Sequence, residues 1–252
     1  MAEDVSTSRA DDNAFRALLD ASAITADLAD ARIVGGQMVN LLTLIYPNAP
    51  RIERRTADAD LGISVDIASA GTIHNRLVGA GYQASSGNHY LREGAEIDVL
   101  APARGGRFTS GEISGRGIDL APGLDLALAS EPIEIELGLT FLNTTFESVI
   151  VRVPRVEVAV VLKAFATRSR TEAKDITDLY NLLSIAHSYD ARDIGGWALA
   201  GDAAGRGTRL DCARTLHALA DTASRSGALR GSEVPTDEFV ALIRENVARP
   251  AR

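Results

Sequence analysis

The chain has 252 residues, of which 46% are hydrophobic, and its formal net charge is -8 at pH 7. This composition supplies enough apolar side chains for a sizeable core, which excludes a disordered chain, and the acidic balance argues against a protein that coats nucleic acid nonspecifically. The single Cys212 excludes a disulfide framework and a cysteine-based zinc site. Because the sequence has neither an apolar leader nor a run of eighteen apolar residues, we expect a cytoplasmic protein with no membrane span.

The first predicted elements surround a pair of glycines. Apolar residues at helical spacing predict one or two short helices within residues 14–29. A brief strand is expected at 32–34, and it runs into Gly35 and Gly36, after which residues 37–45 again follow helical spacing. A glycine pair between a strand and a helix lets a ligand approach the backbone at the helix N-terminus, although such a pair is more often only a turn.

The next segment predicts a strand with one acidic face. Residues 56–66 alternate with period two, so Asp58 and Asp60 point to the same side, about 7 Å apart along the backbone. A helix is expected over 67–79, with Asp66 as its cap. Two carboxylates at this spacing suit Mg²⁺, which takes one or two carboxylates together with substrate phosphates. The alternative is a solvated strand face that binds nothing.

A hairpin follows and adds a third carboxylate. Strands are predicted at 88–92 and 95–100 around a two-residue turn at 93–94. The second strand presents Glu96 and Asp98 on one face. Asp98 would join the two earlier aspartates if the strands are neighbours, with Glu96 as an equally placed substitute.

The remainder of the chain changes from mixed to helical character. A glycine-rich loop or lid is predicted at 105–117. Two short strands are expected after it, at 133–137 and 148–153. From Pro154, which suits a first helical position, apolar stripes at helical spacing predict a series of helices. The expected fold class is therefore α+β (mixed α/β), with a short mixed sheet flanked by helices over residues 1–153 and a mainly helical domain over residues 154–252.

Positive charge is carried almost entirely by arginine, because Lys163 and Lys174 are the only two lysines in the sequence. Lysine supplies a compact, strongly hydrated point charge where the planar guanidinium of arginine does not fit. If residues 163–178 form one continuous helix, four side chains lie on one face of it, namely Lys163, Thr167, Arg170 and Lys174. That face could contact a triphosphate. A break within 169–171 would remove that shared face, and for Lys174 we favour a solvated ion pair with Asp178.

The order of these motifs resembles the nucleotidyltransferase fold of the DNA polymerase β superfamily, in which Gly-Gly or Gly-Ser precedes Asp-x-Asp and a third Asp. The matching segments lie within residues 33–66 and 95–100 and read IVGGQMVNLL, RRTADADLGISVD and AEIDVL. Residues 163–183, KAFATRSRTEAKDITDLYNLL, resemble the helical segment of the AbiEii-like branch, which includes the MenT toxins. Gly36 stands where serine is commoner in the superfamily.

The resemblance implies a nucleotidyl-transfer site with two Mg²⁺ ions and a nucleoside triphosphate as substrate. The implied metal ligands and catalytic carboxylates are Asp58, Asp60 and Asp98, and the glycines that would anchor the triphosphate are Gly35 and Gly36. The triphosphate is attacked at its α-phosphorus, and pyrophosphate leaves.

The resemblance also assigns roles in the helical segment. Lys163 and Asp175 match the later Lys and Asp of the branch, which are implicated in triphosphate binding and in catalysis or its support. The resemblance assigns no role to Lys174, which is a candidate for contact with the triphosphate only through the shared helical face.

These features predict an enzyme that moves an NMP from an NTP to an acceptor hydroxyl. Family likeness suggests a tRNA-modifying toxin of a toxin–antitoxin or abortive-infection system, with a cognate antitoxin as partner. The alternatives are transfer to a small molecule of the aminoglycoside type and a non-catalytic nucleotide-binding regulatory protein of the same fold. Arg51, Arg54 and Arg55 weakly favour a polyanionic acceptor, although they also fit a solvated loop. None of the four histidines shows metal-ligand spacing, so each is interpreted as a surface or partly buried side chain.

Overall fold

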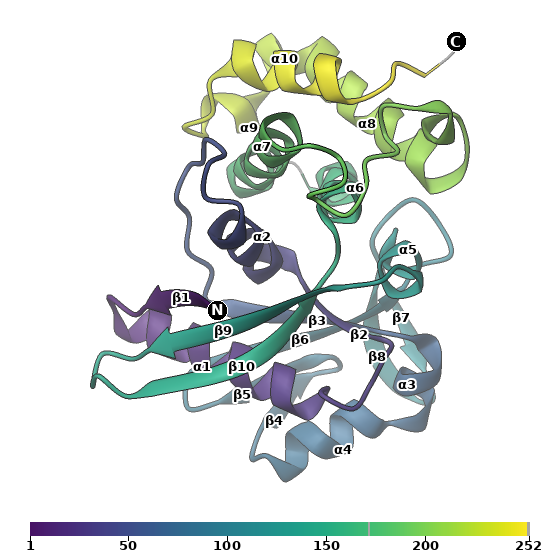
Figure 1. Cartoon of the computed structure of the whole chain (residues 1–252). Coiled ribbons are helices and arrows are strands. Elements are labelled where there is room, and N and C mark those ends of the chain that lie inside the picture. Colours follow the sequence, from purple (N-terminus) through teal and green to yellow (C-terminus); the bar gives the residue numbers. More distant parts are fainter. Residues whose placement is uncertain (171, 251–252) are drawn as a thin grey trace.

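A computed structural model describes residues 1–170 and 172–250, and it shows a mixed α/β fold (Figure 1). Strands and helices are interspersed as far as β10 (Phe146–Val153), and from α6 (Val156–Ser169) onward the described residues are mainly helical. The predicted fold class is therefore confirmed. The division into two domains at residues 153 and 154 stays a prediction.

Within these residues, the secondary-structure elements have the following bounds. The remaining strands are β1 (Ala2–Val5), β2 (Ala31–Val34), β3 (Asp58–Ile63), β4 (Gln83–Ser86), β5 (His89–Arg92), β6 (Ala95–Pro102), β7 (Thr109–Ile113), β8 (Arg116–Ala121) and β9 (Ile133–Thr140). The remaining helices are α1 (Arg9–Ile24), α2 (Gly35–Ile45), α3 (Val65–Ala70), α4 (Thr72–Gly79), α5 (Leu124–Ala129), α7 (Ala173–Ser188), α8 (Gly207–Thr222), α9 (Gly227–Arg230) and α10 (Thr236–Asn246), with short 3-10 turns at Asp202–Gly205 and Ala223–Arg225.

The strands form two sheets. In the smaller sheet the order is β1-β9-β10, with β1 parallel and β10 antiparallel to β9. In the larger sheet the order is β2-β3-β6-β5-β4, and β8 also pairs with β6 and carries β7 on its outer side. The two central strands, β3 and β6, are parallel, whereas β2 and β5 are antiparallel to their neighbours. The sheet is thus mixed, as predicted.

Alternation along β3 and β6 gives the larger sheet one apolar and one acidic face. The buried positions of these strands include Ala59, Leu61, Ile63, Ile97 and Val99. Helix α1 packs against both strands, and its buried side chains include Phe15 and Leu18. Because successive side chains of a strand point to opposite faces, burial of the odd-numbered residues turns the even-numbered aspartates to the other face.

Helix α2 lies between the sheets and the C-terminal helices α6 and α7, which are coloured green in Figure 1. Met38 of α2, Phe165 of α6 and Leu182 of α7 belong to one hydrophobic cluster with the sheet residues. Helix α6 begins at Val156 with Arg155 as its N-cap, so Pro154 precedes the helix and does not occupy its first position. No helix among the described residues combines the length and the apolar character needed to cross a membrane.

Two predicted helical segments differ from the structure. One or two short helices were expected within residues 14–29, and the structure has a single helix, α1, which begins earlier, at Arg9, and ends at Ile24, where the hydroxyl of Thr25 donates a hydrogen bond back to the carbonyl of Ala21. The helix expected over 67–79 is divided into α3 and α4 by Gly71, which has a φ of +67°. Ser64, and not Asp66, caps α3, because its hydroxyl accepts the hydrogen bond from the backbone N–H of Ile67.

The prediction of a loop or lid over 105–117 was wrong for its second half. Residues 109–113 form β7, which pairs with β8 through a tight turn at Ser114 and Gly115. Both turn residues have positive φ. This conformation is required in the type of two-residue hairpin turn whose twist matches the twist of the flanking strands. Glycines within the paired strands, such as Gly111, made this hairpin resemble a loop.

Candidate active site

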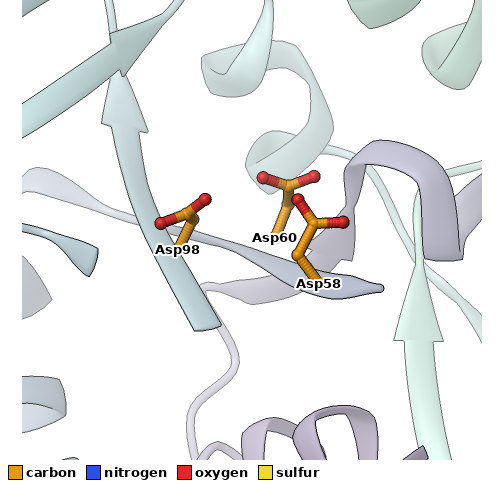
Figure 2. Close-up of side chains that lie close together, drawn as sticks. All are labelled: Asp58, Asp60 and Asp98. Atoms are coloured by element: carbon orange, nitrogen blue, oxygen red, sulfur yellow. The ribbon is translucent and has the colours of Figure 1, made fainter. Parts of the chain in front are cut away.

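Asp58, Asp60 and Asp98 come together on the acidic face of the larger sheet. Asp58 and Asp60 lie on β3, and Asp98 lies directly opposite Asp60 on the parallel strand β6. Each side chain offers one carboxylate oxygen, and these three oxygens all lie within 4.8 Å of one another. Figure 2 shows the side chains of Asp58 and Asp60 next to each other, with Asp98 across from them. The spacing predicted from the sequence thus places the three carboxylates in one cluster.

The strand register places both Glu96 and Asp98 on the acidic face, and the positions of their side chains distinguish them. Glu96 lies opposite Asp58 on the same face of β6, but its side chain is 44% exposed, and its Oε2 lies 3.9 Å from Nε2 of His89. Asp98, and not Glu96, belongs to the close cluster found among the described residues.

The glycine pair lies directly beside the carboxylates. Val34 at the end of β2 is opposite Asp60, and α2 begins at the next residue, Gly35. Gly35 has a φ of +65°, and a Cβ built on it would fall 1.7 Å from Oδ2 of Asp60. A Cβ on Gly36 would fall 2.7 Å from Nη2 of Arg54. Gly35 therefore requires glycine, because its φ is positive and its backbone approaches Asp60 closely, whereas a side chain at Gly36 would displace Arg54.

The carboxylates repel one another in the absence of a cation. The pKa of Asp60 is raised to about 6, mainly because burial disfavours its charged form and secondly because Asp58 lies beside it, with a smaller contribution from Asp98. Lys163 and Arg170 oppose this rise. A cluster with only oxygen donors and a surplus of negative charge has the chemistry that Mg²⁺ or Mn²⁺ prefers, so these residues fit a divalent cation.

Two neighbouring side chains hold the outer members of the cluster. The hydroxyl of Thr56 donates a hydrogen bond of 2.6 Å to Oδ1 of Asp58. On the other side, Nδ1 of His89 lies 2.5 Å from Oδ1 of Asp98. The sequence-based interpretation of His89 as a surface or partly buried residue missed this contact.

A cavity of about 370 Å³ opens beside the carboxylates. Its lining includes Asp60, Asp98 and Gly35, and α6 contributes Lys163. The cavity is further lined by Arg170, Ser110 and Asp119. The carboxylates thus face a space that also contains cationic side chains.

Asp119 is a third carboxylate that lines this cavity, besides Asp60 and Asp98, and sequence reasoning missed it. It lies on β8 opposite Leu100 of β6. Its Oδ1 accepts a hydrogen bond of 2.7 Å from the hydroxyl of Ser110, and the amide of Asn88 donates to its Oδ2 at 3.5 Å. Because the segment before β8 was taken as a loop, no sequence pattern placed Asp119 next to the aspartate cluster.

Lys163 lines the cavity but is not a free cation. Its Nζ lies 2.7 Å from Oδ2 of Asp178, and the side chains of both residues are almost fully buried. Arg54 binds the same carboxylate with two hydrogen bonds of 3.0 Å, from Nε to Oδ1 and from Nη2 to Oδ2. Asp178 therefore joins a cationic side chain of α6 to the segment that precedes β3.

Helices α6 and α7 do not form the continuous helix on which the shared cationic face depended. Helix α6 ends at Ser169 and α7 begins at Ala173, with Thr171 outside the described residues. Lys174 is 46% exposed on its side chain and pairs with Glu172 at 3.0 Å. The expected pair between Lys174 and Asp178 was wrong, because Asp178 faces inward to Lys163. Lys174 is also not among the residues that line the cavity.

Asp175 occupies an unusual buried position. Its carboxylate is fully buried, and neither oxygen has a hydrogen-bond partner among the described residues. Nε of Arg170 lies 3.4 Å from its Oδ2. Burial raises the pKa of Asp175, and Arg170 opposes this effect. Arg170 therefore lines the cavity and also lies next to the carboxylate of Asp175.

The arginine cluster before β3 is neutralised within the protein. Arg54 pairs with Asp178, as described above. The other ion pairs join Arg51 to Glu53 at 3.6 Å, and Arg55 to Asp11 at 3.5 Å and Asp4 at 3.8 Å. These pairs weaken the sequence-based argument that the cluster favours a polyanionic acceptor.

No protein-family model matches the chain, and no curated protein shows significant sequence similarity to it. The chain is therefore described only as a mixed α/β protein with a triad of carboxylates, Asp58, Asp60 and Asp98.

Proposed function

We propose that the protein is a Mg²⁺-dependent nucleotidyltransferase that moves an NMP from an NTP to an acceptor hydroxyl and releases pyrophosphate. One observation carries the proposal: Asp58, Asp60 and Asp98 each present an oxygen within 4.8 Å of the other two. Three carboxylates at this separation repel one another, a shared cation relieves that repulsion, and divalent cations held in this way bind substrate phosphates.

The surroundings of the triad support a phosphate-bearing substrate. Gly35 begins α2 beside Asp60, so the backbone N–H groups of the first turn and the helix dipole favour an anion there. Lys163 and Arg170 line the same cavity. The cavity thus offers carboxylates for a cation and cationic groups for a triphosphate.

The residues suggest how the transfer proceeds. When bound, Mg²⁺ would neutralise charge on the phosphate oxygens. Lys163, Arg170 and the start of α2 orient the triphosphate. The acceptor oxygen forms a bond to the α-phosphorus while the bond to the bridging oxygen breaks, and pyrophosphate leaves with that electron pair. Asp98 accepts the hydroxyl proton, because its carboxylate lines the cavity in which the acceptor would lie.

Within this class we propose the AbiEii-like branch that includes the MenT toxins. The support is the order of Gly35-Gly36, Asp58-x-Asp60 and Asp98, followed by the helical segment with Lys163 and Asp175. On this basis the acceptor is tRNA in the cytoplasm, and a cognate antitoxin restrains the enzyme.

A second candidate acceptor is a small hydroxylated amine of the aminoglycoside type. Asp119 favours it, because its carboxylate lines the cavity and is fixed by Ser110 and Asn88. A carboxylate of this kind attracts a cationic acceptor and repels an RNA backbone.

Labelled NTPs distinguish these possibilities. The protein is incubated with Mg²⁺ and each α-³²P-labelled NTP, together with either total tRNA or a panel of aminoglycosides. Label on RNA supports the first acceptor and label on the small molecule supports the second. Asp60→Ala should abolish transfer, whereas Asp66→Ala, at an exposed position outside the cluster, should not. If wild type transfers nothing and binds no NTP in the presence of Mg²⁺, the proposal fails.

The toxin assignment has its own test in growing cells. Expression of wild type should slow growth, and expression of Asp60→Ala should not. Equal growth with both proteins would contradict the toxin role without affecting the transfer reaction.

A further inference from the structure

His89 is fixed next to the carboxylate triad by the register of the β5-β6 hairpin. It begins β5 and lies directly opposite Asp98, which in turn lies opposite Asp60 on β3. Its imidazole is 27% exposed and lies between two carboxylates, with Nδ1 2.5 Å from Oδ1 of Asp98 and Nε2 3.9 Å from Oε2 of Glu96. Only the first contact has hydrogen-bond length.

The direction of this hydrogen bond follows from the chemistry of the two groups. An ionised carboxylate has no proton and only accepts hydrogen bonds, so Nδ1 of His89 carries the hydrogen and donates it to Asp98. The bond occupies Oδ1 of Asp98, whereas Oδ2 has no hydrogen-bond partner among the described residues.

Asp98 needs such a restraint because its neighbours repel it. Asp98 is one of the negative charges that raise the pKa of Asp60, and it extends from the adjacent strand into the same space. A carboxylate with no partner would rotate away from Asp60 toward solvent, since the side chain of Asp98 is 30% exposed. The imidazole opposes this rotation by holding one oxygen on the far side.

We propose that His89 is a positioning residue of the cation site, which presents Asp98 to the space shared with Asp58 and Asp60. This inference rests on the proposed function, because it assumes a divalent cation between the three carboxylates. The imidazole acts through Asp98 and does not touch the cation itself. Side chains that orient metal-ligating groups in this way typically account for about 10–100-fold in metal affinity.

The test is Mn²⁺ binding to the full chain, measured from the electron paramagnetic resonance signal of the free ion. Wild type is compared with His89→Ala, which removes the donor, and with His89→Asn, whose amide keeps an N–H near the position of Nδ1. The control is His74→Asn, because His74 also uses Nδ1 for a hydrogen bond, at 3.0 Å to the hydroxyl of Tyr90, away from the triad.

We expect His89→Ala to weaken Mn²⁺ binding by about 10–100-fold, as for other outer-shell partners, and His89→Asn to recover most of the loss. His74→Asn should bind like wild type. If His89→Ala fails to fold by circular dichroism, His89→Leu, which also lacks the donor, replaces it in the comparison, and the same loss of Mn²⁺ affinity is expected.

Two results would overturn the inference while leaving the proposed function intact. One is a His89→Ala protein that binds Mn²⁺ as tightly as wild type. The other is a folded His89→Asn protein that binds as weakly as His89→Ala, because the donated hydrogen bond would then not be the cause. If wild type itself binds no Mn²⁺, the cation site fails, and the inference fails with it.

Discussion

The backbone of Gly35 and the carboxylate of Asp60 occupy adjacent space at the end of β2, so closely that a Cβ on Gly35 would lie 1.7 Å from Oδ2 of Asp60. The antiparallel register of β2 and β3 fixes this relationship, because Val34 pairs with Asp60 and the chain turns into α2 at the next residue. The start of a helix and a metal-binding candidate are therefore held together by the sheet itself.

Gly35→Ala should destabilise the protein and displace Asp60. The new methyl group clashes with the carboxylate, and alanine must adopt a φ of +65°. We expect a loss of about 2–4 kcal/mol in the free energy of unfolding, which combines overpacking with backbone strain. Urea denaturation measures it. Gly79→Ala is the control, because no atom lies within 4 Å of the new Cβ and the position is helical; it should be neutral or slightly stabilising. Equal effects of both substitutions would contradict the role of Gly35.

Asp60→Asn should remove cation binding and yet stabilise the protein when no metal is present. The amide relieves the burial of a charge and the repulsion from Asp58, which together raise the pKa of Asp60 to about 6. The expected gain is about 1–3 kcal/mol at pH 7 in the presence of EDTA. Thermal unfolding with EDTA and Mn²⁺ titration provide the two measurements. Asp66→Asn, at an exposed position on α3, should change neither. A metal-free Asp60→Asn protein that is less stable than wild type would contradict the account.

The same carboxylate makes a defined contribution to the pH dependence of stability. Its pKa is about 6 in the folded protein and 3.8 as the ordinary value. Between these values the folded state binds more protons than the unfolded state, so the contribution of Asp60 falls as pH rises from about 4 to about 6. With EDTA, the difference in unfolding free energy between Asp60→Asn and wild type should therefore grow over this range. A difference that is constant or shrinks would contradict the raised pKa.

The two lysines of the chain should behave differently. Lys163→Met leaves Asp178 buried with Arg54 as its remaining partner, so we expect a loss of about 2–3 kcal/mol, somewhat less than for a fully broken buried pair. Lys174→Met removes only an exposed pair with Glu172 and should cost less than about 0.5 kcal/mol. Urea denaturation checks both values.

Replacement of each lysine by arginine keeps the positive charge and changes the shape of the cationic group, so the transfer activity of these variants shows which of the two properties matters. Lys163→Arg keeps the charge but puts a larger, planar group beside Asp178 in a buried space, so it should lose most of the transfer activity. Lys174→Arg should transfer at the wild-type rate. Wild-type rates for Lys163→Arg would show that a compact ammonium group is not needed there.

Much of the candidate site could be predicted from local sequence patterns. Period-two alternation in β3 places Asp58 and Asp60 on one face, and the hairpin with its turn at 93–94 brings Asp98 into a paired strand. The same turn pairs Arg92 with Ala95, so continuing the register would have placed His89 opposite Asp98. His89 was therefore accessible to sequence reasoning, which instead searched only for metal-ligand spacing among histidines.

Other features depend on packing between distant segments. Lys163 meets Asp178 only because α6 and α7 pack against each other, and no local pattern shows which acidic side chain faces inward. Strand β1 is fixed by its parallel pairing with β9, more than a hundred residues away in the sequence. Asp119 reaches the cavity through a glycine-containing hairpin, where weak strand propensity hides the alternation.

In the proposed function, the aspartate triad binds a nucleoside triphosphate through a divalent cation. Equilibrium binding of a labelled NTP to wild type and Asp60→Asn, in Mg²⁺ and in EDTA, tests this directly. We expect binding to wild type in Mg²⁺, and loss of that binding both in EDTA and in Asp60→Asn. Absence of binding to wild type in millimolar Mg²⁺, or equal binding under all four conditions, would contradict it.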